Sequence, residues 1–177
     1  MSETDEKPEI TFPPASGTSL YILAPFVPTP PDVVERMLQL GDVTNTDTVY
    51  DLGCGDGRII ITAARKYGAR GVGVDIEQYR VAESQSHAQA AGVERLVTFR
   101  QQDAMTVDLS AATVVMLYLV GWSTEKLGPI IAETARAGTR IVSHNFGMAG
   151  WVPIKTEKFT GEDGNPHSLY LWIMGNS

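Results

Sequence analysis

The sequence is poor in the residues on which disulfide, zinc and nucleic-acid chemistry depend. Its single cysteine, Cys54, excludes an internal disulfide and fits a reducing compartment, and no zinc-ligand spacing is present. The 14 lysine and arginine residues are outnumbered by 21 aspartate and glutamate residues, which gives a net charge of -7. Unassisted binding to a phosphate backbone requires clustered basic residues. We therefore expect neither a metal site nor a nucleic-acid partner.

Long apolar runs are also missing. The stretch from Leu20 to Val27 is far too short to cross a bilayer, and it contains Pro25. The first nine residues carry mostly acidic charges, whereas signal and transit peptides begin with basic ones. We therefore expect a cytoplasmic protein with no membrane partner.

Length and composition are those of one globular domain, with 43% hydrophobic and 20% charged residues. Residues 1–18 are polar and contain Pro13, Pro14 and Gly17, which discourage regular structure. We therefore expect residues 1–18 to form a disordered tail and residues 19–177 to form the domain.

Two hydrophobic periodicities alternate along this domain, and each early helical pattern ends at a glycine. The alternation predicts an α/β fold, a Rossmann-like doubly wound and mostly parallel seven-stranded sheet. A glycine-rich turn near residues 161–166 predicts an antiparallel hairpin at the C-terminus. The predicted strands are Thr48–Leu52, Gly71–Val74, Val97–Arg100, Val114–Leu119, Arg140–Ser143, Ile154–Thr160 and Ser168–Met174. The predicted helices are a short one between Pro30 and Gly41, Arg58–Tyr67 and Gln78–Ala91.

A glycine turn after the first predicted strand carries most of the chemical information. Gly53, Gly55 and Gly57 stand at alternate positions, and a helical pattern follows at once. Glycine tolerates positive φ and lets a ligand approach where a Cβ would collide. A dinucleotide-binding turn places its third glycine three residues after the second, where this chain has Arg58. The spacing argues against a nicotinamide-dependent oxidoreductase, and a purely structural turn stays open as an alternative.

Carboxylates stand at the ends of three successive predicted strands. Asp51 precedes the first glycine and suits a ligand with a cationic amino-acid end. Asp75 ends the second strand, where its oxygens could accept both ribose hydroxyls of an adenosine, the alternative being a helix N-cap. Asp103 follows the third strand and could accept from an adenine amino group. Ligands of open α/β sheets bind at this edge, so we expect the three carboxylates near one another.

These residues resemble the glycine motif, acidic loop and adenine loop of class I S-adenosylmethionine (SAM)-dependent methyltransferases, over about residues 48–143. Residues 25–30, which read Pro-Phe-Val-Pro-Thr-Pro, and residues 51–59 look more closely like one group. That group is the small lysine methyltransferases related to the ATP-synthase c-subunit lysine methyltransferases and their prokaryotic relatives. The resemblance implies SAM as cofactor and a protein lysine or a small molecule as methyl acceptor, with a non-catalytic SAM-binding protein as the alternative.

The resemblance also implies which residues meet the cofactor. Phe26, Pro28 and Thr29 are expected to cover it from the N-terminal side. Asp56 and Arg58 either pair with each other or touch the methionine carboxylate. The expected SAM contacts are Asp51, Gly53, Gly55, Gly57, Asp75 and Asp103.

The sequence singles out no definite catalytic residue. Methyl transfer chiefly requires alignment of nucleophile and methyl group, and a lysine nucleophile must also lose its proton. Tyr118 after the fourth predicted strand and His144 after the fifth are weak candidates, because core packing explains Tyr118 at least equally well and a structural role explains His144 somewhat better. We expect no role for His87 on a helix face or for His167 in a turn.

Overall fold

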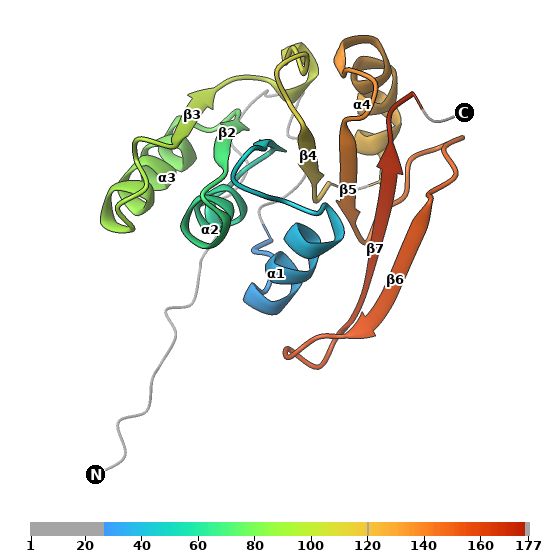
Figure 1. The fold of residues 1–177 in the computed structure, drawn as a ribbon, viewed down its shortest axis with the longest axis horizontal. Coiled ribbons are helices and arrows are strands. Elements are labelled where there is room, and N and C mark those ends of the chain that lie inside the picture. Colours follow the sequence, from blue (N-terminus) through green and yellow to red (C-terminus); the bar gives the residue numbers. More distant parts are fainter. Residues whose placement is uncertain (1–26, 120, 176–177) are drawn as a thin grey trace, which may run out of the picture.

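The computed structural model describes residues 27–119 and 121–175, except the side chains of residues 121 and 122. The predicted tail and Phe26 lie outside the described residues. Seven strands form one sheet in the order β3-β2-β1-β4-β5-β7-β6 (Figure 1). The elements are α1 (Pro31–Leu40), β1 (Thr48–Leu52), α2 (Arg58–Tyr67), β2 (Arg70–Asp75), α3 (Gln78–Ala90), β3 (Val97–Gln101), η1 (Ala104–Thr106), β4 (Val114–Leu117), α4 (Gly121–Thr134), β5 (Arg140–His144), β6 (Lys155–Thr160) and β7 (Pro166–Ile173).

The strand order confirms the predicted doubly wound sheet with an antiparallel hairpin. β1 pairs in parallel with β2 on one side and β4 on the other, so the strand order reverses between β1 and β4. β7 pairs antiparallel with β5 and with the edge strand β6. The register places Leu52 of β1 opposite Val74 of β2 and Leu117 of β4. The carboxyl ends of these strands therefore meet at the switch point, where ligands of such sheets bind.

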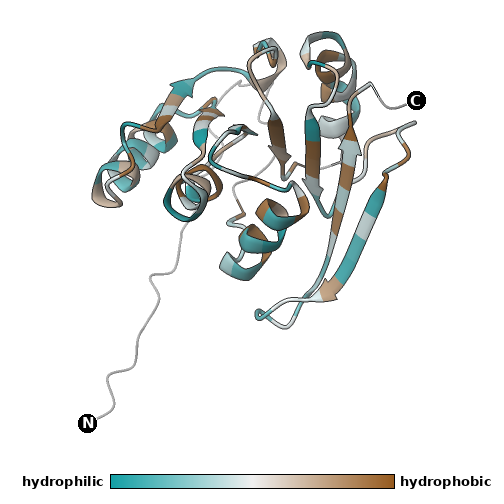
Figure 2. Ribbon diagram, in the orientation of Figure 1, coloured by the Kyte–Doolittle hydropathy of each residue, from teal (hydrophilic) through white to brown (hydrophobic). Residues whose placement is uncertain are grey.

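Helices cover both faces of the sheet and bury its central strands. α1, α2 and α3 contribute to one hydrophobic cluster, and α4 contributes to the cluster on the opposite face. Figure 2 shows hydrophobic residues concentrated on β4 and hydrophilic ones on much of the edge strand β6. All four residues of β4 are buried. A strand covered on both faces needs no alternation of polar and apolar residues, which explains its continuous apolar sequence.

Beyond shifts of single residues at the ends of other elements, the structure differs from the prediction in three places. α4 is a 14-residue helix that the sequence analysis does not predict, because Gly128 and Pro129 interrupt its pattern. Leu127 and Ile131, both fully buried, anchor it to the sheet, so tertiary packing outweighs weak local propensity. β4 ends at Leu117, two residues early, and His167 lies inside β7, buried, instead of in a turn.

Candidate functional site

The glycine turn between β1 and α2 folds over the end of β2. Gly53, Gly55 and Gly57 all have positive φ, at 82°, 55° and 80°. The Gly53 and Cys54 amides both donate to the Val74 carbonyl, at 2.9 and 2.8 Å. At Gly57 a Cβ would lie 2.9 Å from the Phe99 ring. Gly57 is therefore required by backbone shape and packing, whatever ligand approaches the turn.

Asp75, the last residue of β2, holds the turn in place. One carboxylate oxygen accepts from the Gly55 amide and the other from the Glu77 amide, each at 3.0 Å. Ser84 of α3 donates to the Gly55 carbonyl at 2.8 Å, so the backbone of Gly55 is held through both its amide and its carbonyl. The N-cap of α3 is Glu77, so the helix N-cap alternative for Asp75 is wrong. Each oxygen keeps a second lone pair for a ligand hydroxyl.

Asp51, near the end of β1, is a buried carboxylate with an exposed fraction of 3%. Burial and the nearby charges of Asp75 and Asp56 raise its pKa to about 8. Among the described residues, none forms a hydrogen bond or ion pair with its side chain. A buried carboxylate without a cationic partner is costly, so the site is complementary to a ligand that brings a cation. An amino-acid ammonium group fits this requirement.

The segment before α1 is tied to the turn through Arg58. The Arg58 guanidinium binds the Asp56 carboxylate, at 2.6 Å for the shortest contact, and donates to the Thr29 carbonyl at 2.9 Å. The local pairing of Asp56 with Arg58 is therefore the alternative that the structure adopts. Burial works against ionisation of Asp56, but the Arg58 hydrogen bonds and charge hold its pKa below the usual value. Thr29 is buried and the neighbouring Pro28 is half-buried.

Asp103 lies in the loop that follows β3. Gln102, one residue earlier, donates its amide to the Asp75 carbonyl at 3.0 Å, which brings this loop to the end of β2. The Asp103 side chain caps η1 by accepting from the Met105 amide at 2.9 Å. One of its oxygens is thus engaged in holding the loop, and the other accepts no hydrogen bond from a described residue.

Tyr118 and His144 come together at the ends of β4 and β5. Tyr118 follows β4 directly, and its ring centroid lies 4.1 Å from that of His144, the last residue of β5. His144 is fully buried, and its Nε2 lies 2.9 Å from Nδ1 of His167. The sequence alone predicts no role for His167. Antiparallel pairing of β5 with β7 brings the two histidines together, and no local pattern signals this contact.

Within the described part of the chain, one group of side chains lies close enough to share a metal ion. It consists of Asp56, Glu83 and His87, whose ligand atoms lie within 4.8 Å of one another. Asp56 is already bound by Arg58, and Glu83 pairs with Arg80. His87 uses Nδ1 on the Asp56 carbonyl. These atoms have protein partners, so the group does not indicate a metal site.

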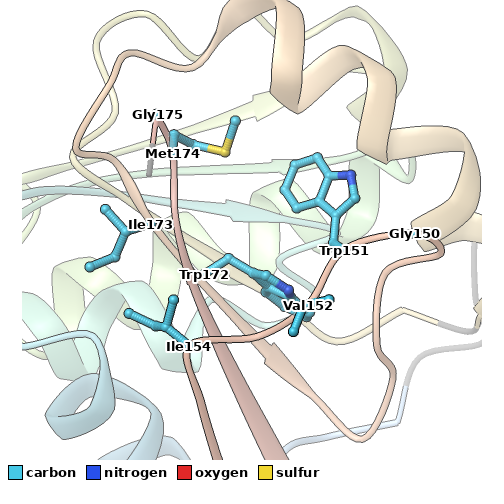
Figure 3. A pocket seen from close by; sticks show the side chains of 8 residues that line it. All are labelled: Gly150, Trp151, Val152, Ile154, Trp172, Ile173, Met174 and Gly175. Atoms are coloured by element: carbon cyan, nitrogen blue, oxygen red, sulfur yellow. The ribbon is translucent and has the colours of Figure 1, made fainter. Parts of the chain in front are cut away.

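A hollow lies at the end of β7 (Figure 3). β7 runs antiparallel to β5, with Ile173 opposite Arg140, so its end lies at the amino edge of β5. The candidate site lies at the opposite edge. The hollow is lined by Gly150, Trp151, Val152, Ile154, Trp172, Ile173, Met174 and Gly175.

In the part of the chain that the structure describes, no helix has the length and apolar content needed to span a membrane.

The chain is similar to known proteins over most of its length. Residues 51–155 match the ANTKMT methyltransferase domain family. A protein-lysine N-methyltransferase of Saccharolobus islandicus is 43% identical over 153 residues, which cover 85% of this chain and 94% of that protein. A lysine N-methyltransferase of the ATP-synthase c-subunit, from Xenopus laevis, is 29% identical over 73% of this chain and 56% of its own length.

The chain is also similar, in both sequence and fold, to a solved structure of an enzyme with its product bound. The crystal structure of an RNA methyltransferase from Salinibacter ruber, in complex with S-adenosyl-L-homocysteine, is 48% identical and superimposes with a TM-score of 0.81. The superposition covers 85% of this chain and 95% of that one. Its bound product and the strand order agree with SAM as the cofactor, and they exclude the nicotinamide alternative. The chain therefore belongs to the ANTKMT methyltransferase domain family and is a SAM-dependent methyltransferase.

Proposed function

We propose that this enzyme methylates lysine side chains of proteins. The observation that carries the proposal is the 43% identity to a protein-lysine N-methyltransferase, over 94% of the length of that relative. The net charge of -7 supports it, because an acidic enzyme attracts a lysine-bearing partner. The second candidate is methylation of RNA, which is what the 48% identical Salinibacter protein is named for. The same negative charge disfavours RNA phosphates.

The individual contacts to SAM are proposed from the carboxylates at the sheet edge. Asp51 is proposed to pair with the SAM ammonium group, since it is buried and lacks a cationic partner among the described residues. Asp75 is proposed to accept the ribose hydroxyls, and Asp103 to accept from the adenine amino group. Both side chains also hold their own loops through backbone amides.

The glycine turn and the segment before α1 complete the proposed site. Exposed Gly53 offers its backbone to the ligand, while Gly55 and Gly57 are buried and shape the turn. Arg58 keeps Thr29 and Pro28 beside this turn, which supports their proposed covering role. Phe26 retains the same expected role, outside the described residues.

For methyl transfer, the protein has chiefly to align the lysine nitrogen with the methyl group and to exclude water. When bound, SAM would supply an electrophilic methyl group on sulfur. Attack of a neutral lysine amine on the methyl carbon would form the N–C bond in line as the C–S bond breaks, with S-adenosylhomocysteine as the leaving group and the proton of the new ammonium passing to solvent. An apolar, aromatic mouth lowers the pKa of an entering lysine by desolvating its charge. Tyr118 is proposed to meet the acceptor nitrogen there. The cytoplasmic location stays a prediction.

The proposal is tested by incubating the enzyme with methyl-labelled SAM and a protein and RNA extract of the expression host. The Asp75→Ala variant serves as the blank. Label in proteins, located on lysine by mass spectrometry, is the expected result. Label confined to RNA or to small molecules would overturn the protein-lysine assignment but keep the methyltransferase.

A further inference from the structure

Three polar side chains connect the β6–β7 turn to the end of β5. His144 Nε2 lies 2.9 Å from His167 Nδ1, and His167 Nε2 lies 3.0 and 3.1 Å from the two oxygens of Asp163. His144 has an exposed fraction of 0% and His167 one of 7%, whereas Asp163 lies on the exposed turn. Hydrogen bonds at both ring nitrogens of His167 fix the orientation of its ring, and one of them restrains the His144 ring.

The carboxylate determines where the proton lies on a neutral His167 and, through it, on His144. Asp163 is ionised at neutral pH from its ordinary pKa of 3.8, and the hydrogen bond from His167 lowers that pKa further, to about 2. A carboxylate only accepts, so His167 carries its proton on Nε2. In neutral His167 the other nitrogen accepts, and therefore His144 donates from Nε2. Nδ1 of His144 is then a bare acceptor, and it is buried with no hydrogen-bond partner among the described residues.

The network ends on Tyr118 by a ring contact. The Tyr118 ring lies against the His144 ring, at 4.1 Å between centroids and 34° between planes. Burial raises the pKa of Tyr118, and the nearby Asn145 side chain works against this rise. Asn145 is held in turn by Ser168, whose amide donates to its side chain at 3.0 Å. Its φ of 64° is unusual for a residue other than glycine, and such strain persists only where the surroundings impose it.

Tyr118 also lies next to the glycine turn. Leu117 of β4 pairs with Leu52 of β1, so Tyr118 and Gly53 are the next residues beyond two paired strand ends. A Cβ on Gly53 would lie 3.2 Å from the Leu119 side chain, which confirms that the segment after β4 touches the turn. The network therefore reaches the edge where the cofactor is proposed to bind.

We propose that Asp163, His167 and His144 are positioning residues that hold the Tyr118 ring in place to meet the methyl acceptor. The inference rests on the proposed function and adds three residues to it. Asp163 and His167 come from the C-terminal hairpin, so this hairpin takes part in acceptor alignment. Small errors in alignment cost large factors in rate. His144 orients Tyr118 by contact, and its partners keep His144 from rotating.

Two substitutions at His167 test the network in the full-length protein. His167→Ala removes both hydrogen bonds. In His167→Gln the amide oxygen accepts from His144 and the amide nitrogen donates to Asp163, as the neutral imidazole does, but the side chain does not titrate. We expect His167→Ala to lower kcat for protein labelling about tenfold or more, with the Kd for SAM changed less than twofold. His167→Gln should restore most of the rate.

Asp163→Ala and Asp108→Ala form a matched pair. Both aspartates lie on exposed turns and accept from the backbone amide two residues on, at 3.0 Å for Asp163 and 2.9 Å for Asp108. Only Asp163 also binds a histidine. Asp163→Ala should therefore slow methyl transfer and Asp108→Ala should not. Equal rates for the pair, or His167→Gln as slow as His167→Ala, would overturn the positioning role.

A spectroscopic readout separates this inference from the proposed function. Nitrogen-15 NMR of the histidine rings at pH 8.5 should place the proton on Nε2 of both His144 and His167. The Tyr118 ring resonances should shift in His167→Ala and return toward the wild-type positions in His167→Gln. If the wild type labels no protein, the proposed function fails, while these spectra still decide on the network. Mixed tautomers, or unmoved Tyr118 resonances in His167→Ala, would overturn it.

Discussion

Asp75 accepts a hydrogen bond from the Gly55 amide at 3.0 Å, across 20 residues of sequence. This contact joins the end of β2 to the turn after β1, and the second oxygen of Asp75 holds the Glu77 amide at the start of α3. One side chain thus sets the shape of the turn and presents acceptors to a ligand. Loss of the carboxylate should affect both stability and binding.

Asp75→Ala should weaken SAM binding by about 1–3 kcal/mol, because ligand hydroxyls would lose a partner at the sheet edge. Titration calorimetry with S-adenosylhomocysteine measures the change directly. The same variant should unfold at lower urea concentration than Asp108→Ala, which removes an exposed aspartate of no proposed role. An unchanged affinity would contradict the ribose assignment.

Asp51 should make the stability of the ligand-free enzyme depend on pH. Its pKa is raised to about 8 in the folded state, from an ordinary value of 3.8. Between these values the folded protein holds a proton that the unfolded chain has lost. The free energy of unfolding therefore falls as the pH rises from about 4 toward 8. Asp51→Asn should remove this decrease in the free energy of unfolding, because the amide does not titrate. Thermal unfolding should show that the Tm gain of the variant over wild type grows from pH 5 to pH 8.

The same proton should couple to ligand binding. A cationic ligand favours ionised Asp51, so binding at pH 7 should release a proton. Affinity for S-adenosylhomocysteine should therefore rise between pH 6 and 7.5, by up to about tenfold per pH unit. Calorimetry in buffers of different ionisation enthalpy counts the proton. A flat profile in the wild type, matching that of Asp51→Asn, would refute the pairing of Asp51 with the ammonium group.

Gly57→Ala should destabilise the protein more than Gly92→Ala does. Both glycines have positive φ, at 80° and 71°, so each alanine carries a backbone strain of about 1–2 kcal/mol. A Cβ at Gly92 would meet nothing within 4 Å, whereas at Gly57 it would press on Phe99. Overpacking should add about 1–3 kcal/mol in the Gly57 variant. Urea unfolding of both variants gives the difference, and equal losses would remove the packing argument.

Deletion of residues 1–18 tests the predicted domain boundary. If residues 19–177 form the domain, the shortened protein should keep its Tm and its affinity for S-adenosylhomocysteine. Scanning calorimetry and titration of the two proteins provide the comparison. A large loss of either property would place these residues within the domain.

Local patterns in the sequence were sufficient for much of the fold. β1 and α2 have the predicted bounds, because an apolar run that ends in closely spaced glycines specifies a strand, a turn and a helix within 20 residues. α4 was missed because Gly128 and Pro129 obscure its period. Its stability comes from Leu127 and Ile131 packing on the sheet, which no local pattern contains.

The fold class, the glycine turn and the presence of carboxylates at three strand ends could all be predicted from the amino-acid sequence. Periodicity and residue spacing carry these features, since each depends on neighbours along the chain. Two sets of contacts became visible only in the folded protein: the hydrogen bond from the Gly55 amide to Asp75, and the network of Asp163, His167 and His144. These contacts depend on which strands pair and in which register. Hydrophobic burial over the whole sheet selects that register, and so brings together side chains that are distant in sequence.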